Sequence, residues 1–330
     1  MKERLDIYLA IAVTTKCNYR CFYCKEGGES ICKSQETIPF EKMKKIVRNS
    51  YEIGISNFRI TGGEPTQVEY FGELIEFIMS FSNTKIRINT NGFLLLKYID
   101  IIEEYKMRID IVFSVDSISK FVNGVYFPKY LSSEVVTLTN ELVKREIKVR
   151  YNIVVTSLNK NEVKKLILRS IDELNVNVKL LDLNKFSEYL GYDGKVSGED
   201  AFYLWKKLFV PMSEFYDFLE KISNNHESEW TTGLIGKGHG IPMSSYFRNG
   251  NWIQVKDSQR KPKYSEYCKT ECIMYKKGEC QEGVFSLFLS ANLILHLSGC
   301  KNKSLQFDLN DCDDTKVKEI LKKLLYFVFN

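Results

Sequence analysis

The feature that most constrains the fold is a repeated alternation of short apolar runs and amphipathic stretches from Leu5 to about Asp182. The apolar runs have the length and β-branched content of strands, and the lysine- and glutamate-rich stretches between them have helical spacing. The alternation repeats about six times, so it predicts consecutive strand–helix units. Right-handed crossovers allow a curved, partly closed barrel or an open doubly wound sheet. The predicted strands are residues 7–13, 58–61, 85–90, 109–114, 148–154 and 178–183.

The distinctive motifs of this region all follow predicted strands. CNYRCFYC follows the first strand, TGGEP ends the second, TNG follows the third and SVDS the fourth. In either parallel fold the chemistry is placed at the carboxyl ends of the strands. We therefore expect the motifs to contribute to one site.

Composition narrows the class of protein. The hydrophobic fraction of 44% and charged fraction of 27% are those of an ordinary globular protein. No apolar run is long enough to span a membrane, and the short one near the N-terminus lacks a cleavage site, so we predict a cytoplasmic protein without a membrane partner. The net charge of +5 contains no concentrated basic block. It argues against a nucleic-acid partner and mildly favours an anionic substrate.

Nine cysteines in a reducing compartment indicate metal ligation rather than disulfides. Cys17, Cys21 and Cys24 have the spacing C-x3-C-x2-C in a loop after a strand. Three thiolates on such a loop can hold three irons of a 4Fe-4S cluster and leave the fourth iron open for a cofactor. The spacing alone also allows a zinc site or unligated cysteines.

The cysteine motif, with the aromatic Tyr23 before its last cysteine and a GGEP strand end after it, resembles the radical S-adenosylmethionine (SAM) superfamily. The resemblance implies an α/β fold with a partial (β/α)6 TIM-like barrel. It also implies that SAM binds the open iron, that one electron splits its sulfonium, and that a 5′-deoxyadenosyl radical abstracts a substrate hydrogen. An electron donor such as flavodoxin or ferredoxin is then an expected partner.

The remaining strand-end motifs resemble the cofactor-binding positions of this superfamily. In TGGEP the glycines permit close backbone approach and Glu64 offers an acceptor for the amino group of SAM, whereas the alternative is an ordinary tight turn. An N-G turn and a satisfied core asparagine are the alternatives for TNG and for Asn152. The predicted cofactor-binding residues are Tyr23, Gly62, Gly63, Glu64, Pro65, Thr90, Asn91, Ser114 and Asn152.

The strand–helix rhythm ends near Gly191. There GYDGKVSGED is interpreted as a loop that leads to a helix at 211–223. Further predicted elements are strands at 252–255, 284–289 and 293–297 and a helix at 314–327. We predict a barrel over 1–190, a linker helix and irregular segment that completes the barrel opening over 191–262, and a smaller α+β auxiliary-cluster domain over 263–330.

A second cysteine group lies in this last part. Its spacing is C-x3-C-x7-C-x19-C, around a predicted hairpin that could converge four thiolates: Cys268, Cys272, Cys280 and Cys300. The group resembles the "twitch" form of the SPASM auxiliary domain, which implies a second 4Fe-4S cluster. A structural zinc site and free buried cysteines are the alternatives. We interpret Cys32 and Cys312 as structural, and among the histidines only His296 is a candidate to face the site.

The order of motifs resembles the GTP 3′,8-cyclase branch, but features that would serve GTP are missing. No arginine follows GGEP, the hairpin strand VFSLFLS carries no base, and the chain ends in YFVFN rather than a glycine pair. We therefore predict a divergent relative that acts on another small molecule, nucleoside or peptide. The cyclase itself, a maturase of ribosomally made peptides, and a zinc-stapled binding protein are the alternatives. Basic residues available to an anion include Lys16, Arg59, Arg150, Lys237 and Arg248.

Overall fold

The computed structural model describes most of the chain. The described residues are 5–25, 36–231, 241–260, 262, 264–278, 280, 283, 284, 286–298, 300 and 302–329. Cys32, Lys237 and His239, which were considered above, lie outside them.

The first half of the chain forms the predicted strand–helix series, and the predicted strands are confirmed to within a few residues. The strands are β1 (Leu5–Ala12), β2 (Ile55–Thr61), β3 (Lys85–Thr90), β4 (Ile109–Ser114), β7 (Lys148–Val154) and β8 (Asn177–Leu181). The helices are α1 (Phe40–Glu52), α2 (Phe71–Met79), α3 (Ile99–Glu104), α4 (Ser133–Lys144) and α5 (Lys160–Leu168). Two short strands, β5 (Phe121–Val122) and β6 (Val125–Tyr126), form a small hairpin before α4.

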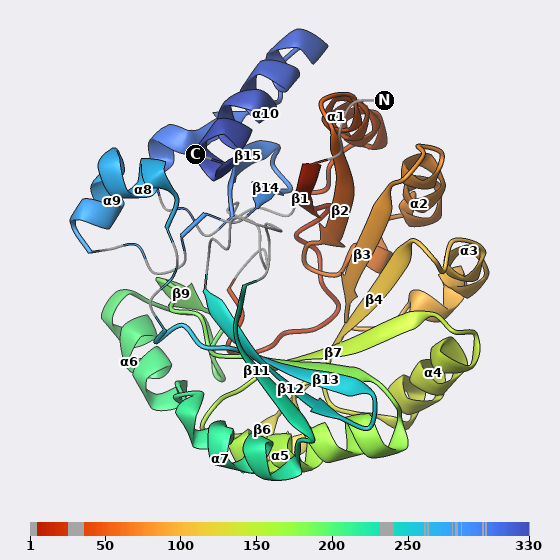
Figure 1. Ribbon diagram of the computed structural model, residues 1–330, viewed down its shortest axis with the longest axis vertical. Helices are drawn as coiled ribbons and strands as arrows, with labels where there is room; N and C mark the ends of the chain where they lie inside the picture. The colour runs from red at the N-terminus through yellow and green to blue at the C-terminus, as the bar shows by residue number, and fades with distance from the viewer. Residues whose placement is uncertain are drawn as a thin grey trace.

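These strands lie side by side in one sheet in the order β8-β7-β4-β3-β2-β1, and every neighbouring pair is parallel. The sheet curves strongly, and helices α1 to α5 follow its outer side (Figure 1). The predicted partial barrel is therefore confirmed.

Alternation along each strand separates a core from a lumen. On β2, for example, Phe58 and Ile60 are fully buried in the main core, whereas Asn57 and Arg59 are only half-buried. The same period of two recurs on β3, β7 and β8, because successive side chains of a strand point to opposite faces. Each large apolar side chain buried against the helices contributes about 1.5–3 kcal/mol. The inner face of β2 and β3 carries polar residues such as Asn57, Arg59 and Arg87.

The C-terminal part extends the same sheet at both edges. At one edge β13 (Asn251–Lys256) pairs in parallel with β8, and β12 (Pro242–Arg248) and β11 (Asn225–Thr231) follow it in antiparallel order. At the other edge β14 (Leu287–Leu289) pairs in parallel with β1 and continues antiparallel into β15 (Ile294–Leu297) and β16 (Gln306–Asp308). The remaining elements are β9 (Glu188–Tyr189), β10 (Val196–Ser197), α7 (Ser213–Ile222), α8 (Glu266–Thr270), α9 (Ile273–Lys276) and α10 (Asp314–Phe329).

One expectation for this part is wrong. The end of GYDGKVSGED is not a loop, because helix α6 (Gly198–Leu208) begins inside it. Glu199 and Asp200 lie in its first turn and Lys206 and Lys207 in its last, an arrangement that complements the helix dipole. The glycines near the start of this helix are typical of loops, so the sequence pattern predicted a loop there. The predicted division into three parts stays a prediction.

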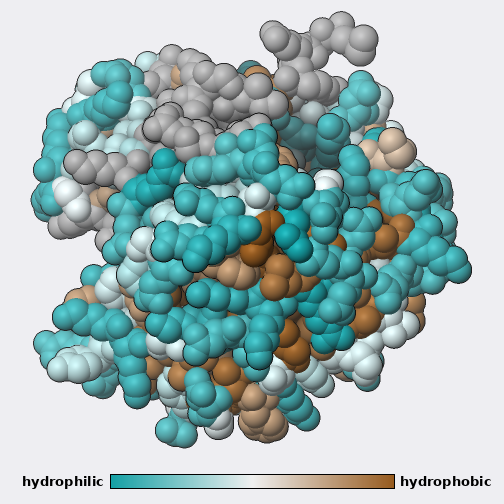
Figure 2. Space-filling model, turned by 60° about the horizontal axis from the view of Figure 1, so that its bottom comes forward, coloured by the Kyte–Doolittle hydropathy of each residue, from teal (hydrophilic) through white to brown (hydrophobic). Residues whose placement is uncertain are grey.

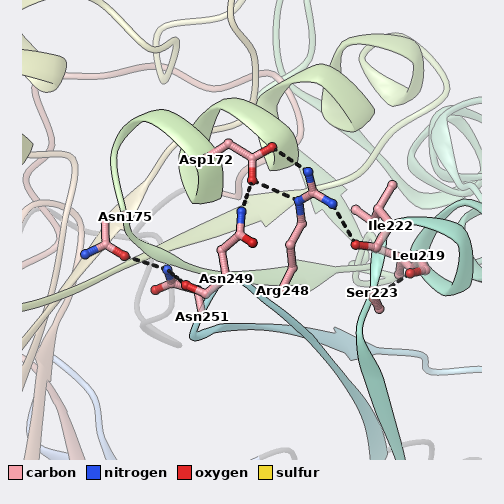
Figure 3. A network of polar contacts seen from close by, with 8 residues as sticks. All are labelled: Asp172, Asn175, Leu219, Ile222, Ser223, Arg248, Asn249 and Asn251. Carbon is pink, nitrogen blue, oxygen red and sulfur yellow. Dashed lines mark hydrogen bonds and ion pairs between the residues drawn. The ribbon is translucent and has the colours of Figure 1, made fainter.

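An ion pair fastens the β11–β12 edge to the barrel (Figure 3). The Arg248 guanidinium donates to both carboxylate oxygens of Asp172, at 2.8 and 2.9 Å, and also to the carbonyl of Ile222. Asn249 donates to the same carboxylate at 2.8 Å. Arg248 is therefore engaged on the outside of the barrel, which removes it from the candidates for binding an anion.

One face of the molecule can be followed by its hydropathy. The face in Figure 2 is mostly hydrophilic, with scattered hydrophobic patches between the polar side chains. Among the described helices, none has both the length and the apolar character needed to cross a membrane.

Candidate functional site

The cysteine loop and the GGEP segment are in direct backbone contact. The N–H of Gly63 donates to the carbonyl of Thr14 at 2.7 Å, and the N–H of Glu64 donates to the carbonyl of Lys16 at 2.7 Å. Lys16 immediately precedes Cys17, the first cysteine of the loop. The ends of β1 and β2 thus hold the three-cysteine loop against the segment predicted to bind SAM.

This contact requires glycine. A Cβ atom on Gly63 would lie 2.1 Å from the carbonyl oxygen of Lys16, and one on Gly62 would lie 2.4 Å from that of Thr14. Gly62 also has a φ of +148°, which other residues rarely adopt. The two glycines therefore allow an approach that any side chain would block.

Glu64 is the centre of a buried hydrogen-bond network. Its carboxylate accepts bonds from the Thr66 hydroxyl at 2.6 Å, from the Thr90 hydroxyl at 2.6 Å and from the N–H of Asn91 at 2.7 Å. The Asn91 side chain in turn donates to Asn18, within the cysteine loop, at 2.8 Å. TGGEP, TNG and the cysteine loop are therefore brought together, with Thr90 and Asn91 in contact with Glu64. Pro65 opens the short turn that follows.

Glu64 combines burial with a fixed orientation. The residue is 1% exposed, and burial raises the pKa of its carboxyl above the usual value, although the hydrogen bonds from Asn91, Thr66 and Thr90 oppose this rise. A buried carboxylate with remaining acceptor capacity is suited to an ammonium group, because a cation would offset its desolvation.

Tyr23 is anchored at the far side of the loop. Its hydroxyl donates a short hydrogen bond to the carboxylate of Asp116, in the SVDS motif, and that carboxylate also accepts from the N–H of Val154 at 2.8 Å. Tyr23 and Asp116 are both almost completely buried. This contact ties the cysteine loop to the ends of β4 and β7.

Lys129 belongs to this neighbourhood, although the sequence did not point to it. Its ammonium lies 5.6 Å from the centre of the Tyr23 ring and interacts with Cys21, Asp116 and the other two cysteines of the loop, which raises the pKa of Lys129 despite its burial. Its backbone carbonyl accepts from the N–H of Asp116 at 2.6 Å. A lysine in a stretch of mixed loop residues carries no signal in one sequence, because only the chain path brings it here.

Ser114 and Asn152 lie opposite each other on neighbouring strands, at the mouth of the barrel. Both are half-buried on the inner face. The side-chain oxygen of Asn152 is buried and has no hydrogen-bond partner among the described residues. Such an acceptor, facing the lumen, is available to a bound molecule rather than satisfied within the core.

The segment around Gly191 also contacts the cysteine loop. The N–H of Leu190 donates to the carbonyl of Cys24 at 2.7 Å, and the N–H of Gly191 donates to the carbonyl of Phe22 at 2.9 Å. The Tyr192 ring stacks on Phe22, with 4.6 Å between ring centres. We call these two backbone hydrogen bonds the Leu190–Gly191 clasp. The sequence did not predict it, because the run GYDG indicates a turn but not the segment that the turn contacts.

The second cysteine group also comes together in space. Cys268 and Cys272 are buried, and Cys280 and Cys300 are half-buried. Cys300 interacts with Cys272, Cys280 and Cys268, and burial raises the pKa of its thiol to about 11. The Ser265 hydroxyl donates to the sulfur of Cys268 at 3.2 Å. Cys312 stands apart and donates to the carbonyl of Asp308 at 3.3 Å.

Neither group has the close spacing of a mononuclear site. Among the described residues, no three His, Cys, Asp or Glu side chains converge around a position for a single metal ion. Zinc would require them to do so, with sulfurs about 2.3 Å from the ion.

His296 lies on the inner face of β15, as considered above. Its ring packs against Phe288, with 5.1 Å between ring centres, and its Nε2 has no hydrogen-bond partner among the residues described. Burial lowers the pKa of His296. The other described histidine, His226, stacks on Tyr246 away from the cysteines.

Comparison with known proteins decides the family. The model of the radical SAM superfamily matches residues 11–169. The GTP 3′,8-cyclase of Alkaliphilus oremlandii is 31% identical over 253 residues, which are 73% of this chain and 74% of that protein. The chain belongs to the radical SAM superfamily. It is thus a radical SAM enzyme related to GTP 3′,8-cyclases, and membership implies SAM and a 4Fe-4S cluster as cofactors.

Solved structures agree on the fold of this radical SAM protein. Streptococcus suis SuiB bound to S-adenosylmethionine superposes with a TM-score of 0.60 at 14% identity, over 94% of this chain and 64% of SuiB. The chain therefore spans about two thirds of SuiB. Native anSMEcpe with bound AdoMet superposes with a TM-score of 0.57 at 17% identity, over 98% of this chain and 82% of that protein.

The residues present fit the implied cofactors. Cys17, Cys21 and Cys24 share one loop, and the Gly62–Gly63 approach leaves backbone, not side chains, beside it. Glu64 supplies a buried acceptor, and the buried side-chain oxygen of Asn152 supplies another at the mouth of the lumen. Three thiolates with adjacent polar acceptors are the donor set that an open-iron cluster and a SAM molecule require.

Proposed function

We propose that this enzyme cleaves SAM reductively at a 4Fe-4S cluster held by Cys17, Cys21 and Cys24 and uses the product to remove a hydrogen atom from a substrate. The reaction that follows is a cyclisation, rearrangement or epimerisation. A flavodoxin- or ferredoxin-like protein would supply the electron. The observation that carries the proposal is the backbone contact of Gly63 and Glu64 with the cysteine loop.

The chain's own residues have separate tasks in this proposal. When bound, the cluster and SAM supply the 5′-deoxyadenosyl radical. Glu64 accepts from the SAM ammonium, while Thr90 and Asn91 keep its carboxylate in place. Tyr23, fixed by Asp116, closes one side of the loop, and the Leu190–Gly191 clasp closes the other. These contacts hold the site rigid and limit access of water.

A second 4Fe-4S cluster on Cys268, Cys272, Cys280 and Cys300 is part of the proposal. The four thiols interact with one another at the open edge of the barrel, although they come from the separate segments around α8, α9 and β15. Four ligands would leave no open iron, and three would leave one for the substrate.

The substrate is proposed to differ from that of the cyclases. Phe288, at the centre of the hairpin strand β14, packs with Ala10 and Ala12 on the inner face of the sheet. An apolar cluster at this place cannot hold a triphosphate, which needs arginine forks or lysines. We therefore favour a different small molecule, nucleoside or peptide, and incubation with millimolar GTP tests this point, because conversion of GTP would identify a cyclase.

Metal content tests the proposal. Anaerobically purified wild-type protein is expected to contain about eight iron atoms with matching sulfide. The triple variant Cys17→Ala/Cys21→Ala/Cys24→Ala should retain about half of the iron and form no 5′-deoxyadenosine from SAM with dithionite. Cys312→Ala, which removes a cysteine outside both groups, is the matched control and should keep all the iron. Total loss of iron from the triple variant would restrict the protein to one cluster, and zinc without iron would refute the proposal.

The pH dependence of SAM binding provides an independent prediction. Because burial raises the pKa of Glu64, its carboxyl takes up a proton at a higher pH than usual. The SAM ammonium binds the ionised form, so affinity should be full above this pKa and should fall as the pH is lowered through it. Calorimetric titrations across the acidic range measure this effect. A Glu64→Gln variant should lose this part of the pH dependence, and an unchanged profile would exclude Glu64 as the acceptor.

A further inference from the structure

The inner face of the barrel carries several basic residues at and below the level of the cofactor motifs. Arg59 on β2 pairs in register with Arg87 on β3, and Arg87 pairs with Asp110 on β4. Arg150 on β7 and Lys179 on β8 occupy the same inner face, as the burial of their strand neighbours in the outer core shows. We refer to Arg59, Arg87, Arg150 and Lys179 as the basic layer.

Asp110 is the acidic residue in contact with Arg87 in the basic layer. Arg87 contacts Asp110 at 3.4 Å, and this is the acid that also attracts Arg150. For Lys179 the strongest influences after burial are repulsive and come from Arg150, Lys256 and Arg87. Placing several cations close together in a half-buried lumen is unfavourable unless anions offset them, and the carboxylates that line the cavity here are those of Asp110 and Glu146.

The hydrogen-bonding capacity of the layer is also unfilled. The Nε atoms of Arg87 and Arg150 are buried and have no hydrogen-bond partner among the residues that the structure describes. The guanidinium of Arg150 also lies 6.0 Å from the centre of the Trp252 ring, but this contact supplies no hydrogen-bond acceptor for the guanidinium. Burial and the neighbouring Arg87 lower the pKa of Arg150 to about 9. An oxyanion would accept hydrogen bonds from the guanidinium groups and would also offset the cost of burying their positive charges.

A cavity provides the space. It has a volume of about 430 Å³ and lies at the amino-terminal ends of β4, β7 and β8. Its walls include Arg87, Asp110, Arg150, Asn177 and Trp252. Arg150 precedes Asn152 by two residues on the same strand, so Arg150 lies roughly 6.6 Å below the level of Ser114 and Asn152, whereas Lys179 is in register with Asn152.

We propose that the basic layer binds an anionic group of the substrate, a phosphate or a carboxylate, so that the substrate is a small anionic molecule. Its anionic end would rest on Arg87 and Arg150, and the carbon that loses hydrogen would point toward the strand ends that carry Glu64 and Ser114. This inference rests on the proposed function, since it assigns the substrate class of the same site. It places anion recognition in the barrel lumen rather than on the C-terminal hairpin.

Anion binding to the anaerobically purified full chain tests the inference. Pyrophosphate and succinate, each compared with sodium chloride of equal ionic strength, are titrated by calorimetry, and melting temperatures are measured in parallel. At least one of them should bind and raise the melting temperature, and the stronger of the two identifies phosphate or carboxylate as the group. Absence of binding by both probes would overturn the inference.

Variants locate the site. Arg87→Gln and Arg150→Gln should weaken binding of the anion roughly tenfold or more, whereas the matched control Arg248→Gln, which removes an arginine from the outer surface, should bind as wild type. Arg150→Gln removes a repelled charge, so without anion its melting temperature should equal or exceed that of wild type. Arg150→Lys keeps the positive charge and replaces the glutamine variant in the test if that variant does not fold. It should weaken anion binding by a smaller factor than Arg150→Gln. Equal weakening in Arg248→Gln would contradict the proposal.

Formation of 5′-deoxyadenosine separates this inference from the proposed function. Cleavage of SAM with dithionite needs no substrate, so it is measured on wild type beside the outer-surface variant Arg248→Gln, which should cleave SAM as wild type does. If wild type cleaves SAM but binds neither anion, the substrate class is wrong and the radical chemistry stands. If wild type binds an anion in the lumen but never cleaves SAM, the proposed function fails and the anion site stands.

Discussion

Replacing Glu64 with glutamine should weaken SAM binding roughly 100-fold. Glutamine keeps the shape of the side chain but replaces a charged acceptor by a neutral one, and its amide would face the Thr66 and Thr90 hydroxyls that now donate to the carboxylate. The change therefore removes the partner of the SAM ammonium and disturbs the network that orients it. Calorimetric titration of SAM into the reconstituted protein measures the effect, and the iron content should stay at the wild-type level.

A matched carboxylate elsewhere controls for this change. Glu162 also accepts several hydrogen bonds, from the N–H groups of Ile118 and Ser119 at 3.1 Å and from the Ser119 hydroxyl at 2.6 Å. Glu162→Gln perturbs a loop of similar character without touching the GGEP segment, so it should leave SAM affinity nearly unchanged. Equal losses in both variants would mean that Glu64 acts only by stabilising the fold.

The barrel could be predicted from the sequence because its determinants are local. Each strand is an apolar run whose outward residues, such as Phe58 and Ile60, must be buried under helices, and each helix has a matching apolar stripe. The helix at Gly198–Leu208 was not predicted because its first residues are a glycine and two acidic residues, which are also typical of loops. The parallel pairing of β14 with β1 could not be derived, because nothing in a three-residue strand specifies a partner so distant in the chain.

The site was predictable where the chemistry requires rare residue types at fixed spacing. The three cysteines and GGEP meet this condition, and their backbone contact follows from the adjacency of β1 and β2. Lys129 and the Leu190–Gly191 clasp do not, since they reach the site through tertiary structure. The basic layer shows an intermediate case. Arg59 and Arg150 were noted as basic residues, but only the register of neighbouring strands shows that they share one lumen with Arg87.

Substituting alanine for Gly63 should abolish SAM binding by displacing the backbone of the GGEP segment. The new Cβ would lie 2.1 Å from the Lys16 carbonyl oxygen, so the GGEP segment and the cysteine loop must move apart. Separation breaks the hydrogen bonds that Gly63 and Glu64 donate to this loop and shifts Glu64 away from the thiols. We expect the free energy of unfolding to fall by about 2 kcal/mol or more, SAM binding to be lost and the N-terminal cluster to become labile. Denaturant unfolding, SAM titration and iron retention after desalting measure the three effects.

Gly72→Ala is the control for this substitution. Gly72 lies in α2, and its added Cβ would meet only the Tyr98 side chain at an ordinary 3.6 Å. Alanine should be tolerated there, with a stability within about 1 kcal/mol of wild type and normal SAM binding, because a helix favours alanine over glycine. The two variants add the same methyl group, so a difference between them isolates the close approach at Gly63. Wild-type SAM affinity in Gly63→Ala would show that the cysteine loop and GGEP need not touch for the cofactor to bind.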